Sequence, residues 1–343
     1  MPENILHAYG LSPENCTVKA LGDGLINHTW KVTCAGRQYI LQQVNQKVFK
    51  APLDIAYNLD LLKHYLDKVA PGYLWAPPLP ALSGDSFVQS ADGAFFRLFV
   101  FVPGSHAINA VTQQAQAYEA ARQFGQFTRL LHGFDVDSLR YTLTDFHHLT
   151  LRCQQLKEAC TTASSGRREL AAEVLATIHS YGYIADTYDK LVRKQLLPLR
   201  VIHHDTKISN VLFNEADKGL CVIDLDTVMP GYFISDVGDM FRTYLSPSNE
   251  EEVDLEKVVV RKEFLNAIHD GYMGQMGEVL TETEKEYFFF AGEFMIYMQA
   301  VRFLTDFLNN DIYYPTGYPL HNLMRTKNQL RLLKEYIQVI SRK

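Results

Sequence analysis

One stretch of the chain, VIHHDTKISNVLFNEADKGLCVIDLDTVMPG at residues 201–231, places acidic and amide side chains around two short apolar runs. The runs at 211–213 and 220–223 are typical of strands, and the polar turn NEADKG between them predicts a hairpin. Residues just before and just after a hairpin lie close together in space. We therefore expect Asp205 and Asn210 to meet Asp224.

Two carboxylates and an amide that converge suit phosphoryl transfer. This reaction needs a group that orients the attacking hydroxyl and oxygen ligands that hold magnesium against the triphosphate. The simpler alternative is that HHD caps a loop and DLD ends a strand, since aspartate is common at turns for backbone reasons. The complete spaced set favours the catalytic interpretation. A metal site on His203 and His204 is disfavoured, because no third ligand follows at metal-site spacing, and we expect His203 to hold the loop.

The pattern H-x-D-x-K-x-x-N, followed by a strand that ends in I-D, resembles the catalytic segment of aminoglycoside and choline kinases, which are relatives of protein kinases. The resemblance implies an α+β, two-lobed protein-kinase-like fold and a phosphotransferase that uses ATP and Mg2+. It implies that Asp205 is the catalytic base and that Lys207 neutralises the migrating phosphoryl group. The implied magnesium ligands are Asn210 and Asp224, with Asp226 close enough to help.

The segment LGDGLINHTWKV at residues 21–32 lies between two expected strands. Alone, its G-x-G pattern also fits an ordinary hairpin turn. Upstream of the catalytic motif, it resembles the family's nucleotide loop, in which glycines let the backbone approach the phosphates. The resemblance places Gly22 and Gly24 in that loop and directs Asn27 and His28 into the cleft.

The segment just before Pro103-Gly104 resembles the hinge whose backbone groups bond adenine, with a plain core strand as the alternative. Its residues are Phe99, Val100, Phe101 and Val102.

The expected third strand, YILQQ at residues 39–43, departs from the kinase pattern. Gln42 stands where relatives carry a lysine or arginine that grips the α- and β-phosphates. The next helix offers Asn58 where a glutamate would pair with that cation. A neutral hydrogen bond between Gln42 and Asn58 would then replace the ion pair. This departure keeps a non-catalytic nucleotide- or sugar-binding protein, a pseudokinase, in consideration.

Three segments resemble the N-acetylhexosamine 1-kinases: GLINHT, DTVMPGYFISDVGDMFR and MQAVRFLTDFL. The resemblance implies transfer of the ATP γ-phosphoryl group to the anomeric hydroxyl of N-acetylglucosamine or N-acetylgalactosamine. A sugar needs hydrogen-bonding groups and an aromatic face. The candidates are His28, Asp205, Arg242, Arg302, Tyr313 and Tyr314.

Alternatives remain for this substrate and for single residues. Arg302 could instead pair with Asp306 one helical turn away. Asp236 and Asp239 are expected to cap a helix and hold the catalytic loop. The same kind of enzyme could act on an amino alcohol such as choline, an aminoglycoside, homoserine or methylthioribose.

Apolar patterning predicts the elements that position these residues. Residues 16–101 are strand-rich with one amphipathic helix at 53–69, which predicts a small antiparallel sheet. Beyond Pro103-Gly104 the sequence becomes helical. We therefore expect a nucleotide-binding lobe at 1–103 and a larger, mainly helical catalytic and substrate-binding lobe at 104–343. Residues 161–168 are expected to form a linker, and two apolar helices are expected after residue 288.

Composition limits the classes of partner. A net charge of -6 provides no positive field for nucleic acid or anionic lipid. No apolar run reaches the roughly eighteen residues that a membrane span needs. The 5 cysteines lack a CxxC pair, which predicts reduced thiols rather than a disulfide framework. We expect a cytoplasmic protein that binds a small-molecule sugar, and the sequence leaves its oligomeric state open.

Overall fold

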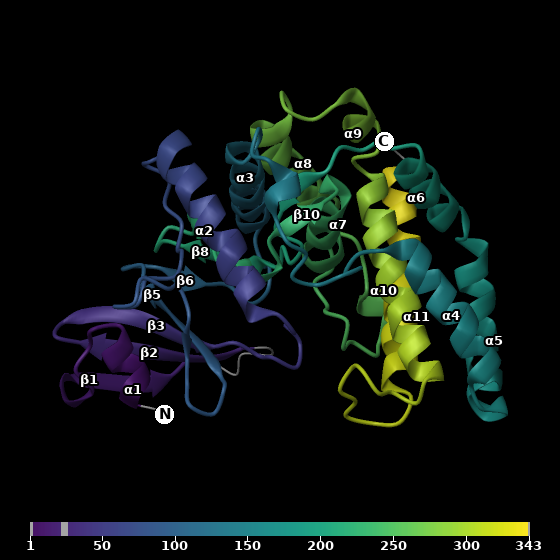
Figure 1. Ribbon diagram of the computed structural model, residues 1–343. Coiled ribbons are helices and arrows are strands. Elements are labelled where there is room, and N and C mark those ends of the chain that lie inside the picture. The colour runs from purple at the N-terminus through teal and green to yellow at the C-terminus, as the bar shows by residue number, and fades with distance from the viewer. Residues whose placement is uncertain (1–2, 22–26, 342–343) are drawn as a thin grey trace.

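The computed structural model describes residues 3–21 and 27–341 and has two lobes (Figure 1). In the described part of the first lobe, an antiparallel sheet has the strand order β1-β2-β3-β5-β4. Its strands are β1 (Cys16–Ala20), β2 (His28–Cys34), β3 (Arg37–Gln43), β4 (Val88–Gln89) and β5 (Phe95–Val100). Helix α2 (Pro52–Val69) lies between the third and fourth strands in sequence, as predicted.

The two faces of this sheet pack differently. One face forms a small core with helix α1 (Glu3–Ala8), in which Val32 and Leu41 contact Ile5 and Leu6. On α2, the four leucine and isoleucine side chains predicted to form its apolar face are all buried: Ile55, Leu59, Leu62 and Leu66. They join the main core of the second lobe. Helix α2 therefore packs against both lobes and couples their positions.

The second lobe is mainly helical, as expected. Its helices are α3 (Gln114–Leu130), α4 (Leu149–Thr162), α5 (Ser165–Ser180), α6 (Tyr183–Arg193), α7 (Phe233–Tyr244), α8 (Lys262–Met276), α9 (Glu282–Glu286), α10 (Phe290–Leu308) and α11 (His321–Ile340). Helices α4 and α5 lie on the outer side of α10, at the end of the molecule far from the sheet (Figure 1). The short 3-10 helices are η1 (Pro13–Asn15), η2 (Val136–Ser138), η3 (Ile208–Asn210), η4 (Leu225–Thr227) and η5 (Leu255–Lys257).

Two small sheets carry the motif at 201–231. Strands β8 (Val211–Phe213) and β9 (Gly219–Val222) form the predicted hairpin, and β6 (His106–Ala107) pairs with β8. Strands β7 (Arg200–Ile202) and β10 (Met229–Gly231) pair antiparallel. The chain thus leaves the first sheet at Val100 and enters the second lobe by His106. The exact lobe boundary near residue 103 stays a prediction.

The expected linker at residues 161–168 is mostly helical. Helix α4 continues to Thr162 and α5 starts at Ser165. Ser164 caps α5 by accepting a hydrogen bond from the Arg167 N–H, and the Arg167 side chain forms an ion pair of 2.8 Å with Asp311. Small and basic residues therefore form a capped, anchored helix start here, and the prediction was wrong.

The prediction of reduced thiols was wrong for two of the cysteines. Strands β1 and β2 pair in a register that sets Cys16 opposite Cys34, with their Cα atoms 4.2 Å apart, and a disulfide joins them. Cysteines that lie on neighbouring strands cannot be recognised by a short sequence spacing, because strand register brings them together. Cys153, Cys160 and Cys221 are free thiols.

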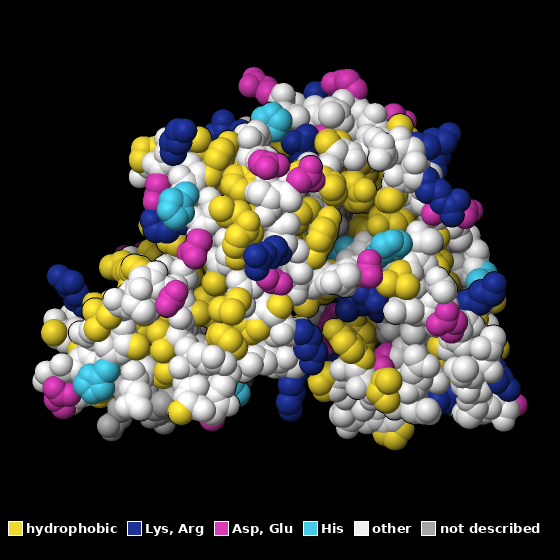
Figure 2. Space-filling model, in the orientation of Figure 1, with side chains coloured by type: hydrophobic (Ala, Val, Ile, Leu, Met, Phe, Trp, Pro, Cys, Tyr) yellow, Lys and Arg dark blue, Asp and Glu magenta, His cyan; other side chains and the backbone are white. Residues whose placement is uncertain are grey.

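The described helices include none with both the length and the apolar character that a bilayer crossing requires. On the surface, a notch separates the lower part of the first lobe from the α10–α11 end, and charged side chains of both signs border it (Figure 2).

Candidate active site

The catalytic loop runs from β7 to β8 and is held by two acids of α7. The Asp236 carboxylate accepts hydrogen bonds from the backbone N–H groups of His203 and His204, at 2.9 and 2.7 Å. The Asp239 carboxylate accepts from the backbone N–H of Thr206 at 2.9 Å. Both acids are buried. The expectation that Asp236 and Asp239 hold the loop is confirmed, whereas the expected capping is not found, because Tyr232 is the N-cap residue of α7 and no described side chain caps it.

The two histidines of the loop are structural. His203 is fully buried, and its Nε2 lies 2.9 Å from the carbonyl oxygen of Ile223. Its Nδ1 accepts from the backbone N–H of Asp205 at 3.3 Å. Burial lowers the pKa of both His203 and His204, which keeps them neutral. The expected role of His203 in holding the loop is therefore confirmed.

The hairpin brings the chain at Asp205, Asn210 and Asp224 close together, and their shared magnesium site stays a prediction. The Asn210 side-chain amide donates to the backbone carbonyl of Asp205 at 2.8 Å. The backbone N–H of Ile223 donates to the backbone carbonyl of Asn210, also at 2.8 Å. The next residue, Asp224, therefore follows directly beside Asn210. The Lys207 ammonium lies 3.1 Å from the Asp205 carboxylate.

Asp224 lies near other acidic side chains and has no hydrogen-bond donor of its own among the described residues. Its backbone is left-handed, with φ 57°, and within residues 3–21 and 27–341 no hydrogen bond or ion pair reaches its carboxylate. Burial raises the pKa of Asp224 to about 7, and the negative charges of Asp226 and Asp205 add to this effect. A carboxylate without a donor, beside other acids, has the chemistry that a divalent cation prefers. The part of the chain that the structure describes contains no cluster of three or more His, Cys, Asp and Glu side chains that could hold a metal, so the magnesium ligands stay a prediction.

Asp226 has donors from the first lobe on both of its oxygens. The Asn27 side-chain amide donates to Oδ2 at 2.8 Å, and the Arg97 guanidinium forms an ion pair with Oδ1. Asp226 and Arg97 are 2% and 1% exposed. Asn27 also accepts from the backbone N–H of Asn45 at 2.9 Å, which fixes its orientation. Asp226 therefore ties the two lobes together, and its role as a magnesium ligand stays a prediction.

Gln42 and Asn58 do not form the expected hydrogen bond with each other. The Gln42 carbonyl oxygen accepts from Nε and Nη2 of Arg97 at 3.1 and 2.9 Å. The Asn58 amide donates to the carbonyls of Arg140 and Val228 at 2.8 and 3.1 Å. The prediction was wrong because cross-strand register sets Gln42 opposite Arg97, while Asn58 faces the second lobe.

The other nucleotide-site predictions stand as follows. Gly22 and Gly24 lie outside the described residues. In the hinge segment, Phe99 and Val100 belong to β5, and the backbone N–H of Phe101 donates to the Gln38 carbonyl at 3.1 Å. The Val102 carbonyl accepts from Ser105 as the chain turns into the second lobe. Their contacts with adenine stay predictions.

A cavity of about 470 Å³ lies between α4, α10 and the loop after α10. Its charged and aromatic lining consists of two arginines, two acids and two tyrosines: Arg152, Arg302, Glu158, Asp306, Tyr313 and Tyr314. The Phe146 ring lies 5.8 Å from the Arg302 guanidinium and 6.4 Å from the His204 ring. The Phe146 ring thus lies between Arg302 and His204 of the loop that follows β7.

The alternative ion pair between Arg302 and Asp306 is not formed. Arg302 donates to Gln299 at 3.3 Å. The Asp306 carboxylate instead accepts from the backbone N–H groups of Tyr313 and Tyr314, both at 2.9 Å. Asp306 therefore orders the tyrosine loop and leaves Arg302 available to a ligand.

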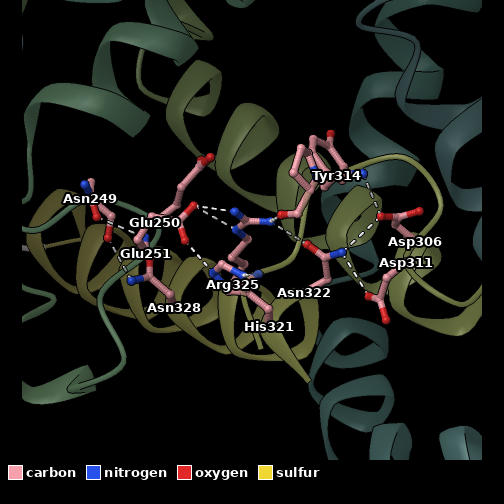
Figure 3. A network of polar contacts seen from close by, with 12 residues as sticks. Asn249, Glu250, Glu251, Asp306, Asp311, Tyr314, His321, Asn322, Arg325 and Asn328 are labelled. Carbon is pink, nitrogen blue, oxygen red and sulfur yellow. Dashed lines mark hydrogen bonds and ion pairs between the residues drawn. The ribbon is translucent and has the colours of Figure 1, made fainter. Parts of the chain in front are cut away.

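A polar network on α11 supports the same loop (Figure 3). Asn322 donates to Asp306 and Asp311 at 3.0 and 2.9 Å. Arg325 donates to the Pro315 carbonyl at 2.9 Å and forms an ion pair of 2.6 Å with Glu251. The network connects the loop after α10 with the loop after α7, two segments far apart in sequence.

Arg242 and His28 occupy different surroundings. Arg242 forms ion pairs with Asp239 at 3.1 Å and with Glu250 at 2.8 Å, so its guanidinium is already compensated. His28 begins β2 and is exposed, with its ring 6.3 Å from that of Trp30. Their contacts with a sugar stay predictions.

Two arginines of the site were missed by sequence reasoning. Arg97 interrupts the apolar strand FFRLFV, and an arginine at such a position was a usable signal, because a buried guanidinium needs an acid or a ligand. Arg152 lies on a helix of weak amphipathic pattern, and nothing in its local sequence marks it. Its place in the cavity depends on how α4 packs against α10.

Together, the fold and the loop geometry define a phosphotransferase with a protein-kinase-like fold. The model of the phosphotransferase enzyme family matches residues 17–260, and the chain belongs to that family.

Solved structures similar to this chain share its fold. An aminoglycoside phosphotransferase from Alicyclobacillus acidocaldarius is 14% identical, with a TM-score of 0.68 over 100% of this chain and 97% of its own. A microcompartment-associated aminopropanol kinase is 18% identical, with a TM-score of 0.61 over 99% and 97%. A spectinomycin phosphotransferase, in complex with ADP and spectinomycin, is 15% identical, with a TM-score of 0.60 over 98% and 97%.

Proposed function

We propose that the protein is an ATP-dependent kinase that phosphorylates the anomeric hydroxyl of N-acetylglucosamine or N-acetylgalactosamine to give the sugar 1-phosphate. The resemblance of three segments to N-acetylhexosamine 1-kinases supports this substrate. The family match and the close approach of the chain at Asp205, Asn210 and Asp224 support the reaction.

In this proposal, the chain's own residues orient the acceptor hydroxyl and neutralise the charge of the transferred phosphoryl group. Asp205 accepts a hydrogen bond from the attacking hydroxyl and takes its proton. Lys207, 3.1 Å from Asp205, is held protonated, because nearby Asp205 and Asp239 outweigh burial and raise the pKa of its ammonium. Lys207 is therefore positioned to neutralise the transferred group. Magnesium, when held by Asn210 and Asp224, supplies charge neutralisation at the triphosphate.

ATP is proposed to bind between the first lobe and the catalytic loop. The spectinomycin phosphotransferase of similar fold contains ADP, which supports a nucleotide site in this fold. The hinge segment Phe99–Val102 is proposed to contact adenine, and Asn27, Gly22 and Gly24 to lie near the phosphates. Each oxygen of Asp226 already has one partner from the first lobe, Asn27 or Arg97, and keeps a second lone pair that could join the metal.

The observation that favours an uncharged acceptor is the pair of arginines in the cavity. Within the described chain, neither Arg152 nor Arg302 has a carboxylate partner. The two guanidiniums are close enough that Arg302, after burial, lowers the pKa of Arg152. Glu158 and Asp306 also line the cavity, but the Asp306 carboxylate is occupied by two backbone N–H groups. A cationic amino alcohol or aminoglycoside would therefore be repelled where it approaches the two arginines. The carbonyl and hydroxyl oxygens of an N-acetylhexosamine would accept from both arginines.

The test is a coupled ADP-release assay with ATP and magnesium. The acceptors are N-acetylglucosamine, N-acetylgalactosamine, glucose, galactose, choline, aminopropanol and spectinomycin, and every assay is repeated with Asp205→Asn. We expect turnover of the N-acetylhexosamines, abolished in the variant, and a sugar 1-phosphate as the product. Turnover of choline or aminopropanol alone would contradict the substrate assignment but not the phosphotransferase.

Other alcohol acceptors remain the second candidate. The aminopropanol kinase and the spectinomycin phosphotransferase have nearly equal TM-scores with this chain, 0.61 and 0.60. Structural similarity therefore does not favour one acceptor over the other. A non-catalytic binding protein is the third, suggested by Gln42 in place of a cation on β3. Binding of Mg·ATP without turnover of any acceptor would favour it.

A further inference from the structure

Kinases of this fold need a cation beside the nucleotide phosphates, and the expected position on β3 carries a glutamine here. Gln42 occupies the position on β3, and its partner on the neighbouring strand β5 is Arg97. Side chains of directly paired residues point to the same face of a sheet. The Arg97 side chain therefore extends from the same face of the sheet as Gln42, the position where a cation from β3 would otherwise lie.

Arg97 is held in place from several sides. Gln42 accepts from its Nε and Nη2, and Asp226 pairs with Nη1. The rings of Phe87 and Phe99 lie 5.6 and 5.1 Å from the guanidinium, within the range of cation–π contact. A guanidinium carries more N–H groups than these contacts use. The side chain is held and nearly fully buried, and its Nη1 makes no hydrogen bond among the described residues.

The location of the guanidinium relative to the catalytic acids is the second observation. Asp226, its ion-pair partner, is two residues from the proposed magnesium ligand Asp224. A triphosphate whose metal is held at Asp224 would thus lie within reach of the Arg97 guanidinium.

We propose that Arg97 supplies, from β5, the cation that contacts the nucleotide phosphates, in place of a lysine or arginine on β3. Gln42 and Asp226 are positioning residues that hold the guanidinium at that place. This inference rests on the proposed function, since it takes the ligand to be a nucleoside triphosphate. It also explains why a chain with Gln42 on β3 can be an active enzyme.

Lys31 is the main rival on the same face of the sheet. Its strand position pairs with Ile40, two residues from Gln42 on β3. Its ammonium lies 4.1 Å from the centre of the Phe101 ring, at the hinge end of the cleft and away from Asp226. Arg97 is therefore better placed for the phosphates.

The experiment measures binding of Mg·ATP, Mg·ADP and adenosine to the full-length protein by calorimetry. The variants are Arg97→Met, Lys31→Met, and the double variant Arg97→Met with Gln42→Lys, which moves a cation to β3. Arg200→Met is a matched control, because Arg200 forms a part-buried ion pair of 2.7 Å with Glu284, away from the site. Melting temperature is recorded for each.

We expect Arg97→Met to weaken Mg·ATP binding by about tenfold or more, while adenosine binding changes little. The double variant should recover most of the loss, and Arg200→Met should lower only the melting temperature. If Arg97→Met does not fold, Arg97→Met with Asp226→Asn removes both charges of the buried pair and is measured instead.

Equal losses for ATP and adenosine would show that Arg97 is only structural and would overturn the proposal. A selective loss of ATP binding in Lys31→Met, but not in Arg97→Met, would assign the role to Lys31. The assay uses no acceptor, so an incorrect sugar assignment leaves its result unchanged. A wild-type protein that binds ATP no better than adenosine would instead contradict both this proposal and the kinase.

Discussion

The side-chain amide of Asn210 donates a hydrogen bond of 2.8 Å to the backbone carbonyl of Asp205. This contact fixes which end of the amide faces the loop. The side-chain nitrogen is used by Asp205, so the side-chain oxygen is the atom left free to accept or to bind a metal. One hydrogen bond thus orients an oxygen ligand and ties it to the backbone of the proposed base.

Replacing Asn210 should expose the metal dependence of the site. We expect Asn210→Ala to lower kcat by about tenfold to a hundredfold at saturating magnesium, and to raise the magnesium concentration needed for half-maximal rate. The measurement is a magnesium titration of ADP release. Asn214→Ala is the control, because Asn214 only accepts from backbone N–H groups in the β8–β9 turn. The same magnesium curve for wild type and Asn210→Ala would argue against Asn210 as a ligand.

Asp224 should matter more than Gln42. Loss of a carboxylate that holds the metal removes several kcal/mol of charge stabilisation, so we expect Asp224→Ala to lower kcat/KM by about a thousandfold or more. Gln42→Ala removes two hydrogen bonds to a charged donor, roughly 1.5–3 kcal/mol, and should cost about tenfold to a hundredfold. Parallel steady-state kinetics of the two variants decide this. Equal losses would refute the assignment of Asp224.

The sequence predicted the parts of the site that follow from local order. The hairpin at 211–222 brings Asp205, Asn210 and Asp224 together, because short strands and a polar turn determine what lies beside what. The apolar face of α2 and the loop-holding role of Asp236 follow from equally local patterns.

What sequence reasoning missed depends on register and packing between distant elements. Gln42 was recognised as a departure, but its partner Arg97 is 55 residues away on a strand that pairs only after α2 is inserted. Cys16 and Cys34 became neighbours in the same way. The linker at 161–168 was mistaken for a loop, since small and basic residues alone do not reveal that Ser164 caps a helix.

The stability of the catalytic loop should depend on pH through Asp236. Burial raises the pKa of Asp236 from an ordinary value of about 4 to about 7 in the folded protein. The folded state therefore binds this proton more tightly than the unfolded state does. The stabilising contribution of this carboxyl group to the free energy of unfolding is fully present below about pH 4. It is lost as pH rises through about 7.

Urea denaturation of wild type and Asp236→Asn between about pH 5 and about pH 8 measures this dependence. The free energy of unfolding of wild type, relative to the variant, should fall with rising pH by up to about 1.4 kcal/mol per unit. The opposite slope would mean that the two backbone N–H donors outweigh burial and hold the pKa of Asp236 low.

Close packing of α7 against α10 should make Gly238 intolerant of any side chain. A Cβ at Gly238 would lie 2.8 Å from the Cβ of Met295 and even closer to the carbonyl oxygen of Ala291. Gly238→Ala should destabilise the protein by about 1–3 kcal/mol, because α7 carries the acids that hold the catalytic loop and cannot shift freely. Gly274→Ala is the matched control: its Cβ meets nothing within 4 Å, and alanine in an exposed helix position should stabilise by up to about 1 kcal/mol. Thermal unfolding of both variants tests the contrast, and similar melting temperatures would show that the helices separate easily.

The two arginines of the cavity should determine the acceptor without affecting the nucleotide. Arg302 has Gln299 as its hydrogen-bond partner and leaves its remaining donors for the ligand, so Arg302→Ala should raise KM for the N-acetylhexosamine by about tenfold and leave KM for ATP unchanged. Arg152→Ala should have a smaller effect in the same direction, because Arg152 also donates to the Asp145 carbonyl at 2.7 Å. Lys157→Ala, on the exposed face of α4, serves as the control for surface charge.

Initial rates are measured with each substrate varied in turn. If both arginine variants raise KM for ATP as much as KM for the sugar, the cavity between α4 and α10 does not bind the acceptor. If instead they allow choline or aminopropanol to be phosphorylated, the positive charge of the cavity is what excludes cationic acceptors in the wild-type enzyme.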